Sequence, residues 1–326
     1  MEKTRKWRWG VNRWLVLLFT VLSYLAARFF PPIRPHIQVA AEHLSTRPLF
    51  SLPALGEVYL TNTMVGIFIV DMILIVGAFF VNRAVKSGEL VPKGLSGAVE
   101  ALLEAIYNLT ESTAGKWAKV IFPYFAAISL IVLFSNWLEL IPGVDSIGRL
   151  EPSSQGYAVR QILPHVFALV QGETQGGGYL VVPAVRVPST DLNFTVALAL
   201  VSVVMTQVIG IRAQGLRFFT KYFNTTTLFT KPFFGAIDFA VGLLETISEF
   251  SKILSFSFRL FGNLFAGAVL LFVVGSLIPV FAQSLVLLFE FFIGIIQALV
   301  FGMLTMVFMT QATQGHAGEE QSQAAE

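Results

Sequence analysis

The residues of this chain that could carry chemistry are polar side chains set within long apolar segments. Projected on a helix, segment 235–274 places such residues along one face, at alternating steps of four and three positions. This face comprises Glu245, Glu249, Lys252, Phe256, Arg259, Asn263 and Ala266, with Ser248, Ser251 and Ser255 beside it. Segment 281–313 has a second face, made of Glu290, Gly294, Gln297, Phe301 and Thr305. Ionisable side chains are costly in hydrocarbon, so these two faces are the first candidates for a functional site.

Arg259 is the residue that a structural role explains least well. Lys252 lies seven residues before it, and no ionisable residue follows until Glu290. A buried arginine stays protonated at physiological pH, so it is a fixed positive charge. Its insertion in a membrane costs at least about 2.5–3.5 kcal/mol. No carboxylate follows three or four residues later, so we expect its partner to be Glu290 or a group of another chain. A voltage sensor would repeat arginine, and this segment has only one.

Simpler roles stay open for the neighbouring polar residues. Lys252 could extend to the membrane interface, or it could pair with Glu245 seven residues earlier. Glu249 could be a solvated charge at the edge of the helix. Gln297 could form a hydrogen bond between two helices.

The composition indicates the environment of these faces. Apolar residues make up 55% of the 326 residues, charged residues only 13%, and mean hydropathy is +0.72. A soluble domain carries about 25% charged residues, so the chain is predicted to be a membrane protein. A net charge of +2 provides no field that would hold a nucleic acid. Without Cys, and with four widely separated His residues, the sequence predicts no disulfide, metal site or cofactor.

Six apolar segments are long enough to cross a membrane, which takes about 20 residues. They are 14–30, 62–82, 120–141, 191–211, 235–274 and 281–313. We therefore predict an all-α polytopic membrane protein with about six membrane helices. The last two would be about 60 and 50 Å long, and the hydrocarbon core is about 30 Å thick, so they must be strongly tilted or broken. Residues 96–111 predict an amphipathic helix at the interface, with an acidic polar face.

The distribution of Lys and Arg orients these segments. If the N-terminus is cytoplasmic, the inside segments carry most of the basic residues. Both termini are then cytoplasmic, and 143–190 forms a long outside loop. Segment 14–30 follows a basic stretch, as in a signal peptide, but no small-residue cleavage site follows it. We therefore expect a retained anchor.

Three segments resemble subunit a of the F-type ATP synthase. The most specific is SEFSKILSFSFRLFGNLFAGAVLL (248–271), and VPSTDLNFTVALAL (187–200) and NWLELIP (136–142) match as well. Glu290 and Gln297 add the seven-residue spacing of the last helix in that family.

The resemblance covers about 58–313 and suggests three parts. Residues 1–57 would form an N-terminal membrane anchor and outside segment. Residues 58–313 would form the membrane domain that resembles subunit a, with 143–190 as its enlarged outside loop. Residues 314–326 would be a polar C-terminal tail.

The resemblance implies roles for the matching residues. Arg259 matches the arginine that faces the carboxylate of each rotor c-subunit. The outside half-channel is matched by Asn136, Asn263, Glu290 and Gln297, and the cytoplasmic half-channel by Glu245, Ser248 and Ser251. Supporting positions are matched by Glu139, Asp191, Asn193 and Lys252. Relatives have Glu or His where this chain has Ala268, so we expect Glu290 to be the sole titrating relay on the outside path.

The resemblance also implies a function and partners. The function would be ion translocation, with the proton as the expected ion, coupled to ATP synthesis and without catalysis on ATP by this chain itself. The partners would be the c-subunit ring, b-type stalk subunits and the rest of the synthase, in the plasma membrane of a bacterium rather than of an organelle. Two other classes fit less well. A secondary transporter would show repeated halves, and an intramembrane hydrolase would need a metal cluster or a base within a span.

Overall fold

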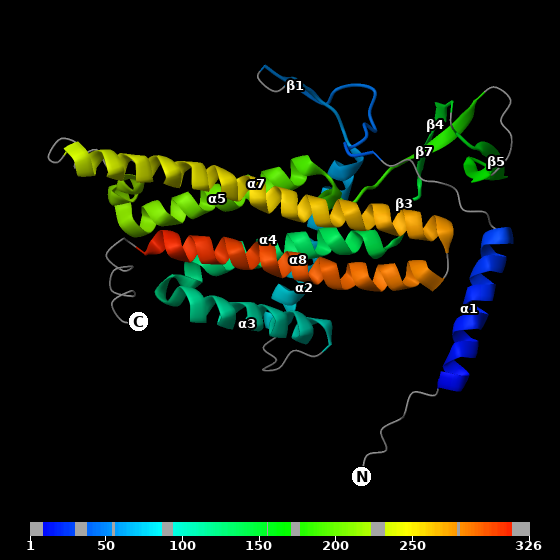
Figure 1. Ribbon diagram of the computed structural model, residues 1–326, viewed down its shortest axis with the longest axis horizontal. Helices are drawn as coiled ribbons and strands as arrows, with labels where there is room; N and C mark the ends of the chain where they lie inside the picture. Colours follow the sequence, from blue (N-terminus) through cyan, green and yellow to red (C-terminus); the bar gives the residue numbers. More distant parts are fainter. Residues whose placement is uncertain are drawn as a thin grey trace, which may run out of the picture. The chain divides into compact units, whose positions relative to one another are not determined.

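Long helices make up most of the structure, a computed structural model that describes residues 9–29, 38–53, 56–86, 94–154, 156–170, 177–222, 232–278 and 281–314 (Figure 1). The long helices are α1 (Trp9–Phe29), α2 (Asn62–Lys86), α3 (Leu95–Ala114), α4 (Ala118–Trp137), α5 (Leu192–Gln214), α7 (Pro232–Leu277) and α8 (Phe281–Thr313). The predicted all-α architecture is thereby confirmed. Most of the predicted tail 314–326 lies outside the described residues.

The chain divides into two compact units, and α7 and α8 contribute to both. Unit 1 comprises Met1–Val65, Glu139–Val187 and Leu264–Ile293. Unit 2 comprises Gly66–Leu138, Pro188–Asn263 and Gly294–Glu326. The division into anchor, membrane domain and tail that the sequence suggested stays a prediction.

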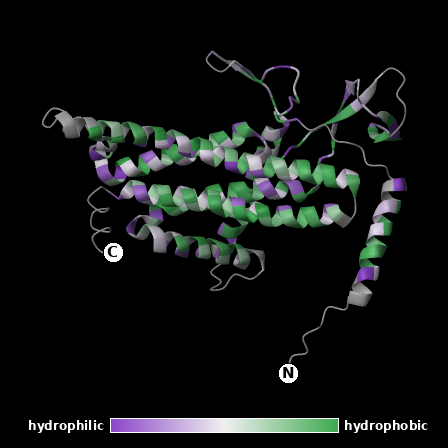
Figure 2. Cartoon of the chain, viewed as in Figure 1, coloured by the Kyte–Doolittle hydropathy of each residue, from purple (hydrophilic) through white to green (hydrophobic). Residues whose placement is uncertain are grey.

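Five stretches of the described chain are helical, long and apolar enough to cross a membrane. They are Asn62–Arg83, Gly97–Leu140, Leu192–Gln214, Phe239–Leu277 and Ala282–Thr313. Figure 2 shows hydrophobic residues along most of their length. In α1 the described apolar stretch, Arg13–Leu25, is shorter. The chain is therefore a polytopic membrane protein, and a sixth crossing stays a prediction.

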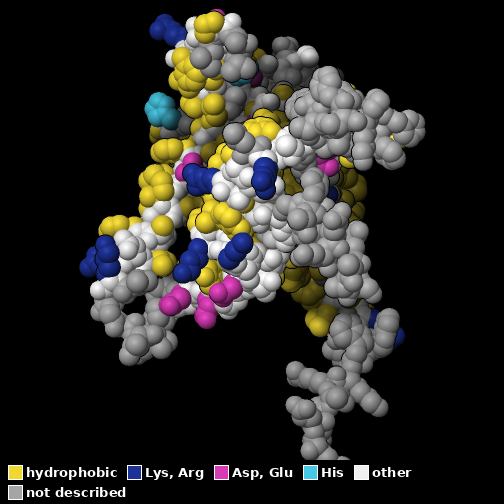
Figure 3. Space-filling model, turned by 90° about the vertical axis from the view of Figure 1, so that its left-hand side faces the viewer, with side chains coloured by type: hydrophobic (Ala, Val, Ile, Leu, Met, Phe, Trp, Pro, Cys, Tyr) yellow, Lys and Arg dark blue, Asp and Glu magenta, His cyan; other side chains and the backbone are white. Residues whose placement is uncertain are grey.

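The amphipathic helix expected at 96–111 is present as α3. Its acidic residues Glu100, Glu104 and Glu111 are exposed, whereas Ile106 is buried in a core shared with α4. The chain then turns at Gly115, whose positive φ of 52° suits glycine. Charged side chains gather beside hydrophobic ones on the face drawn in Figure 3. The apolar side of α3 thus packs on protein, and its place at a membrane interface stays a prediction.

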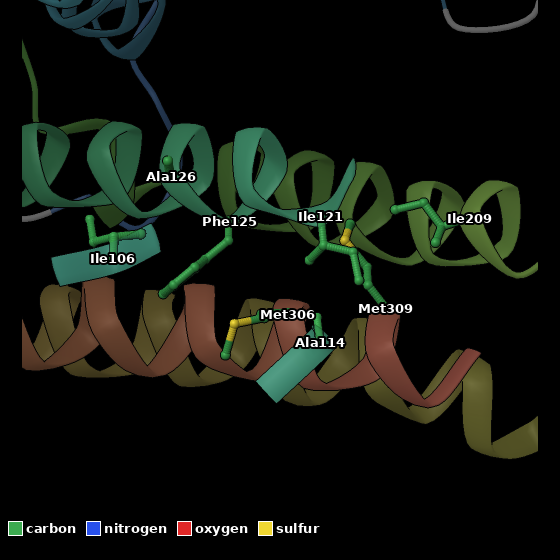
Figure 4. Close-up of a cluster of buried hydrophobic side chains, with 8 residues drawn as sticks. All are labelled: Ile106, Ala114, Ile121, Phe125, Ala126, Ile209, Met306 and Met309. Carbon is green, nitrogen blue, oxygen red and sulfur yellow. The ribbon is translucent and has the colours of Figure 1, made fainter. Parts of the chain in front are cut away.

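Unit 2 is held together by side chains from four helices that are distant in the sequence. The cluster consists of Ile106, Ala114, Ile121, Phe125, Ala126, Ile209, Met306 and Met309 (Figure 4). It joins α3, α4, α5 and α8. A hydrogen bond of 2.8 Å between the hydroxyls of Ser202 and Thr305 also links α5 to α8. Such polar contacts and close packing are what hold helices together in a membrane.

The helices α7 and α8 pack against each other as an antiparallel pair. In unit 2, the ring of Phe256 lies 5.2 Å from that of Phe301 and 5.6 Å from that of Phe308. In unit 1, Gly267 lies against Glu290. With 46 and 33 residues, the two helices measure about 69 and 50 Å. The sequence predicted that these helices are either strongly tilted or broken. Each helix is continuous, so a strong tilt stays the prediction.

Short strands occur in unit 1, which the sequence analysis did not anticipate. The strand β1 (Phe50–Leu52) pairs with β2 (Gly56–Val58), β4 (Gly148–Ser153) with β7 (Gly178–Pro183), and β5 (Ala158–Leu163) with β6 (Val166–Val170). All three pairs are antiparallel, and β3 spans Pro142–Asp145. Because they lie outside the apolar stretches, they do not conflict with the rule that unpaired strand edges are excluded from lipid.

Replacing Gly302 should test the packing of α8 on α4. A Cβ atom at this position would lie 1.9 Å from Ser129 Oγ and 2.8 Å from a ring atom of Phe125. Because this core is close-packed, we expect Gly302→Ala to lower the free energy of unfolding by about 1–3 kcal/mol. The measurement is reversible unfolding in mixed micelles. The matched control is Gly77→Ala, where a Cβ would meet nothing within 4 Å. Equal stability of the two variants would contradict this packing.

Candidate functional site

The polar face predicted on α7 divides into two environments. Glu245, Glu249 and Lys252 are partly buried, whereas Arg259 and Asn263 are exposed. The reason is geometrical. Steps of four and three residues repeat every 3.5 residues, and an α-helix has 3.6 residues per turn, so such a face drifts by about 20° per heptad. The two ends of this face therefore point in different directions.

Arg259 lies exposed on α7 and has a serine as its hydrogen-bond partner. Its Nη2 atom donates to Ser255 Oγ at 3.2 Å. Within the described part of unit 2, no carboxylate lies at ion-pair distance from it. The neighbouring Leu254 and Phe258 are exposed as well. The arginine thus presents a fixed positive charge on an apolar surface, where it could bind a carboxylate of another molecule.

Two helical turns before Arg259, Lys252 begins a network that the sequence predicted only in part. Lys252 Nζ lies 2.8 Å from Glu249 Oε1, with side chains that are 19% and 13% exposed. The ammonium group also lies 4.5 Å from the ring centroid of Phe308 on α8. Glu249 is therefore a paired, mostly buried charge and no solvated edge charge. Its separation of three residues from Lys252 is a helix-neighbour spacing that could have indicated the pair.

Tyr222 extends this network to α5. Its hydroxyl donates to Gln207 Oε1 at 2.9 Å. Burial, and next the charges of Glu249 and Glu245, raise the pKa of Tyr222 above its ordinary value. The hydroxyl thus stays protonated and can act as a donor. Ser251 bonds to Ile247 O of its own helix, and both it and Ser248 are exposed.

The end of α4 is joined to α8 by Asn136. This residue is buried, and its Nδ2 atom donates to Gly294 O at 3.2 Å. Its Oδ1 atom is buried without a hydrogen-bond partner in the described chain. Gln297, three residues after Gly294, is partly buried. The structure thus brings Asn136 to the polar face predicted for 281–313, at Gly294.

Asp191 has a local structural role at the start of α5. Its side chain accepts a hydrogen bond of 2.9 Å from the backbone N–H of Asn193, as an N-cap residue does. Asp191 is buried, whereas the side chain of Asn193 is exposed. The cap explains the polar start of this span.

In unit 1 two buried carboxyl groups lie within electrostatic range of each other. Glu139 is 9% exposed and Glu290 is 4% exposed. Both carboxyl oxygens of Glu139, and Oε2 of Glu290, have no hydrogen-bond partner among the described residues. Their charges act on each other. Glu290, expected to be the sole titrating group here, therefore has a second carboxyl group near it.

The carboxyl group of Glu290 lies directly against the backbone of α7. A Cβ atom at Gly267 would lie 2.3 Å from Glu290 Oε1. The neighbouring Ala268, where relatives were expected to carry Glu or His, is buried. Small residues at both positions leave room for the carboxyl group of α8.

Asp145, which was not among the predicted site residues, adds a titratable group in the loop 143–190 of unit 1. It has a left-handed backbone with φ of 61°. Its backbone N–H donates to Val185 O at 3.3 Å. Arg186, the residue after Val185, donates hydrogen bonds to Gln38 O at 2.7 Å and to Ala40 O at 2.9 Å. Burial raises the pKa of Asp145 to about 6, although the charge of Arg186 acts in the opposite direction.

These features define a class of protein. It is a polytopic all-α membrane protein with an arginine and several carboxyl groups on its membrane helices, and residues of this kind mark ion pathways. The ATP synthase A chain family matches residues 64–310, which is more than half of the chain. The chain belongs to this family.

Relatives named ATP synthase subunit a support the assignment. One from Campylobacter jejuni is 28% identical over 264 residues, which is 78% of this chain and 94% of the relative. One from Moorella thermoacetica is 26% identical over 262 residues, covering 80% and 95%. One from Syntrophobacter fumaroxidans is 28% identical over 234 residues, covering 72% and 77%. The resemblance is therefore confirmed, and with it proton translocation in the membrane sector of an F-type ATP synthase, by a subunit that does not itself catalyse ATP synthesis.

The pKa of Asp145 predicts a pH dependence of the stability of the loop 143–190. Because its pKa is about 6 in the folded chain against an ordinary 3.8, the folded loop holds this proton more tightly than the unfolded chain. Its stability should therefore be highest below about pH 4 and fall as pH rises to about 6. Hydrogen exchange of residues 142–187, corrected for intrinsic rates, measures this. Asp145→Asn should remove most of the dependence, and an unchanged profile in that variant would contradict the assignment.

Proposed function

We propose that this chain is the stationary ion path of a rotary ATP synthase, in which Arg259 holds the ionised carboxylate of each passing rotor c-subunit. The observation that supports this most is the exposure of Arg259 on α7 between apolar side chains. A fixed charge on such a surface requires a counter-charge from outside the chain. A carboxylate that must also pass through lipid is an appropriate partner, because it can be neutralised by a proton.

The outside half-channel would consist of Asn136, Glu139, Glu290 and Gln297, with Asn263 near its rotor end. Asn136 and the two carboxyl groups have buried oxygens without hydrogen-bond partners among the described residues, as expected of atoms that meet water or a passing proton. Two carboxylates in a medium of low dielectric repel each other, so the pair Glu139 and Glu290 would favour a state in which one of the two groups carries a proton. Glu139 would then provide the second titratable group, which relatives carry at the position of Ala268.

The cytoplasmic half-channel would consist of Glu245, Ser248 and Ser251. Glu249 neutralises Lys252, so the cation does not repel protons that leave along this side of α7. Tyr222, which donates to Gln207 and lies within electrostatic range of Glu249, would link this part of α7 to α5. The proton released by a rotor carboxyl group would pass Glu245 and reach the cytoplasm.

Arg259 separates the two half-channels electrostatically. It favours the ionised form of the approaching carboxylate, so the proton leaves on the cytoplasmic side. Its fixed charge repels any proton that moves directly between the half-channels. The driving force is about 2.3 kcal/mol per charge for each 100 mV of membrane potential.

The surroundings of the subunit follow from the same proposal. Its partners would be the c-subunit ring, b-type peripheral stalk subunits and the rest of the synthase. It would reside in the plasma membrane of a bacterium with both termini in the cytoplasm, as the distribution of Lys and Arg indicates.

Replacing Arg259 tests the central role. We expect Arg259→Ala to reduce ATP-driven proton pumping in inverted vesicles by at least about a hundredfold, as removal of a preorganised charge does, and to increase the passive leak. The variant Arg212→Ala, which removes an exposed arginine near the end of α5, is the matched control and should pump normally. Coupled pumping at the wild-type rate in Arg259→Ala would contradict the proposal.

Neutral replacements test the carboxyl pair. Glu290→Gln should slow pumping roughly a hundredfold, the lower end of what a positioned proton-transfer group contributes, without preventing assembly. Glu139→Gln should change the pH profile of the pumping rate, because the remaining carboxyl group no longer shares a proton. The control is Glu111→Gln on the exposed side of α3. If Glu290→Gln and Glu139→Gln both pump like the wild type and the control from pH 6 to 9, neither carboxyl group is a relay.

A further inference from the structure

The helix α2 carries a carboxylate in the middle of an apolar span. Between Asn62 and Asn82, Asp71 is the only ionisable residue. It lies nine residues after Asn62 and twelve before Arg83, which is about 14 and 18 Å along the axis. The hydrocarbon core is about 30 Å thick, so Asp71 lies near its middle. An aspartate side chain is too short to reach either interface from there.

Asp71 is exposed on the least covered span of the protein. Only 11% of the apolar window of α2 is buried, against 28% or more in the other four spans. On the same side of the helix lie Phe68, Ile75 and Phe79, which are 66%, 63% and 63% exposed. They are three, four and eight positions from Asp71, so all four share one helical face. We call Phe68, Asp71, Ile75 and Phe79 the α2 stripe.

The chain itself offers no cation for this carboxylate in the parts described. In unit 2, to which Asp71 belongs, Lys252 pairs with Glu249 and Arg259 bonds to Ser255. The N-terminal apolar segment has no basic residue between Arg13 and Arg28. It therefore cannot place a cation at mid-membrane depth, wherever it packs. A second copy of the chain, docked symmetrically on the stripe, would bring two Asp71 carboxylates together, which repel.

We propose that the α2 stripe is the docking surface for a membrane helix of another subunit, and that this helix carries a Lys or Arg facing Asp71. The charges are complementary, and they attract strongly at low dielectric. The apolar residues above and below Asp71 would shield the ion pair from lipid headgroups and water. The pair would fix both depth and orientation of the partner helix, as single buried polar residues fix register between helices. This contact is separate from Arg259 and from the ion path.

Cross-linking in the assembled complex tests the stripe with Asp71 left intact. Because the chain has no Cys, a single introduced Cys is the one site in this chain for a photoreactive maleimide. We expect Phe68→Cys and Ile75→Cys to give adducts with one and the same helix of another subunit, identified by mass spectrometry. That helix should have a Lys or Arg within its apolar span. Ile73→Cys, on the other side of α2, is the matched control and should not give this adduct.

Several outcomes of this experiment would overturn the proposal. Adducts with lipid only would mean that the stripe faces the bilayer. Three other adducts would assign the stripe to another occupant. These are adducts with a second copy of this chain, with the N-terminal helix of the same chain, or with a helix that has no basic residue in its span.

Charge replacement tests the ion pair itself. We expect Asp71→Leu to lower recovery of the cross-linked subunit with the purified complex about tenfold or more, because the partner cation is left uncompensated. Replacing that cation with Leu as well should restore recovery, and so should exchanging the two charges between the helices. The variant Ile73→Ala should recover the subunit normally. Full recovery with Asp71→Leu alone would show that no ion pair exists. Subunit recovery is measured without ion pumping, so failure here and failure of the Arg259 mechanism are distinguishable.

Discussion

Every charge that this protein carries into its apolar spans must be balanced, because hydrocarbon does not solvate it. The structure shows several solutions to this constraint. Lys252 is paired with Glu249 and lies over the ring of Phe308. Glu139 and Glu290 are buried near each other, where one shared proton would reduce their repulsion. Arg259 remains on the surface with a serine as its hydrogen-bond partner. The balanced charges lie mostly buried, and we propose that the exposed one binds a partner.

The paired helices α7 and α8 translate this constraint into a geometry. Small residues let their neighbours approach closely, since the carboxyl group of Glu290 occupies the space beside Gly267, and Asn136 lies against Gly294. Aromatic contacts such as that of Phe256 with Phe301 fill the wider parts of the pair. In this way one continuous helix has a mostly buried polar network at one end and an exposed arginine further along. A single element thus contributes both to the internal packing and to the surface that we propose the rotor contacts.

The sequence allowed much of the architecture to be predicted, for physical reasons. A spanning helix satisfies its own backbone, so an apolar segment of sufficient length indicates one without knowledge of its neighbours. The ranges 191–211 and 281–313 agree with α5 and α8 to within a few residues. The strands within 143–190 were missed because they are short and lack a strong alternation of apolar and polar residues. No role was predicted for Asp71, because a single carboxylate among apolar residues forms no repeating polar face along the helix.

The sequence by itself determined the class of protein and its long helices, and it singled out Arg259 for the role that we propose. These follow from local composition, and from the cost of a charge that no nearby residue balances. Only the tertiary structure decided which polar residues share an environment. It placed Lys252 with Glu249, brought Glu139 near Glu290 and left Arg259 exposed. The reason is that a helical face drifts along a long helix, and partners such as Asn136 and Gly294 come from segments far apart in the chain.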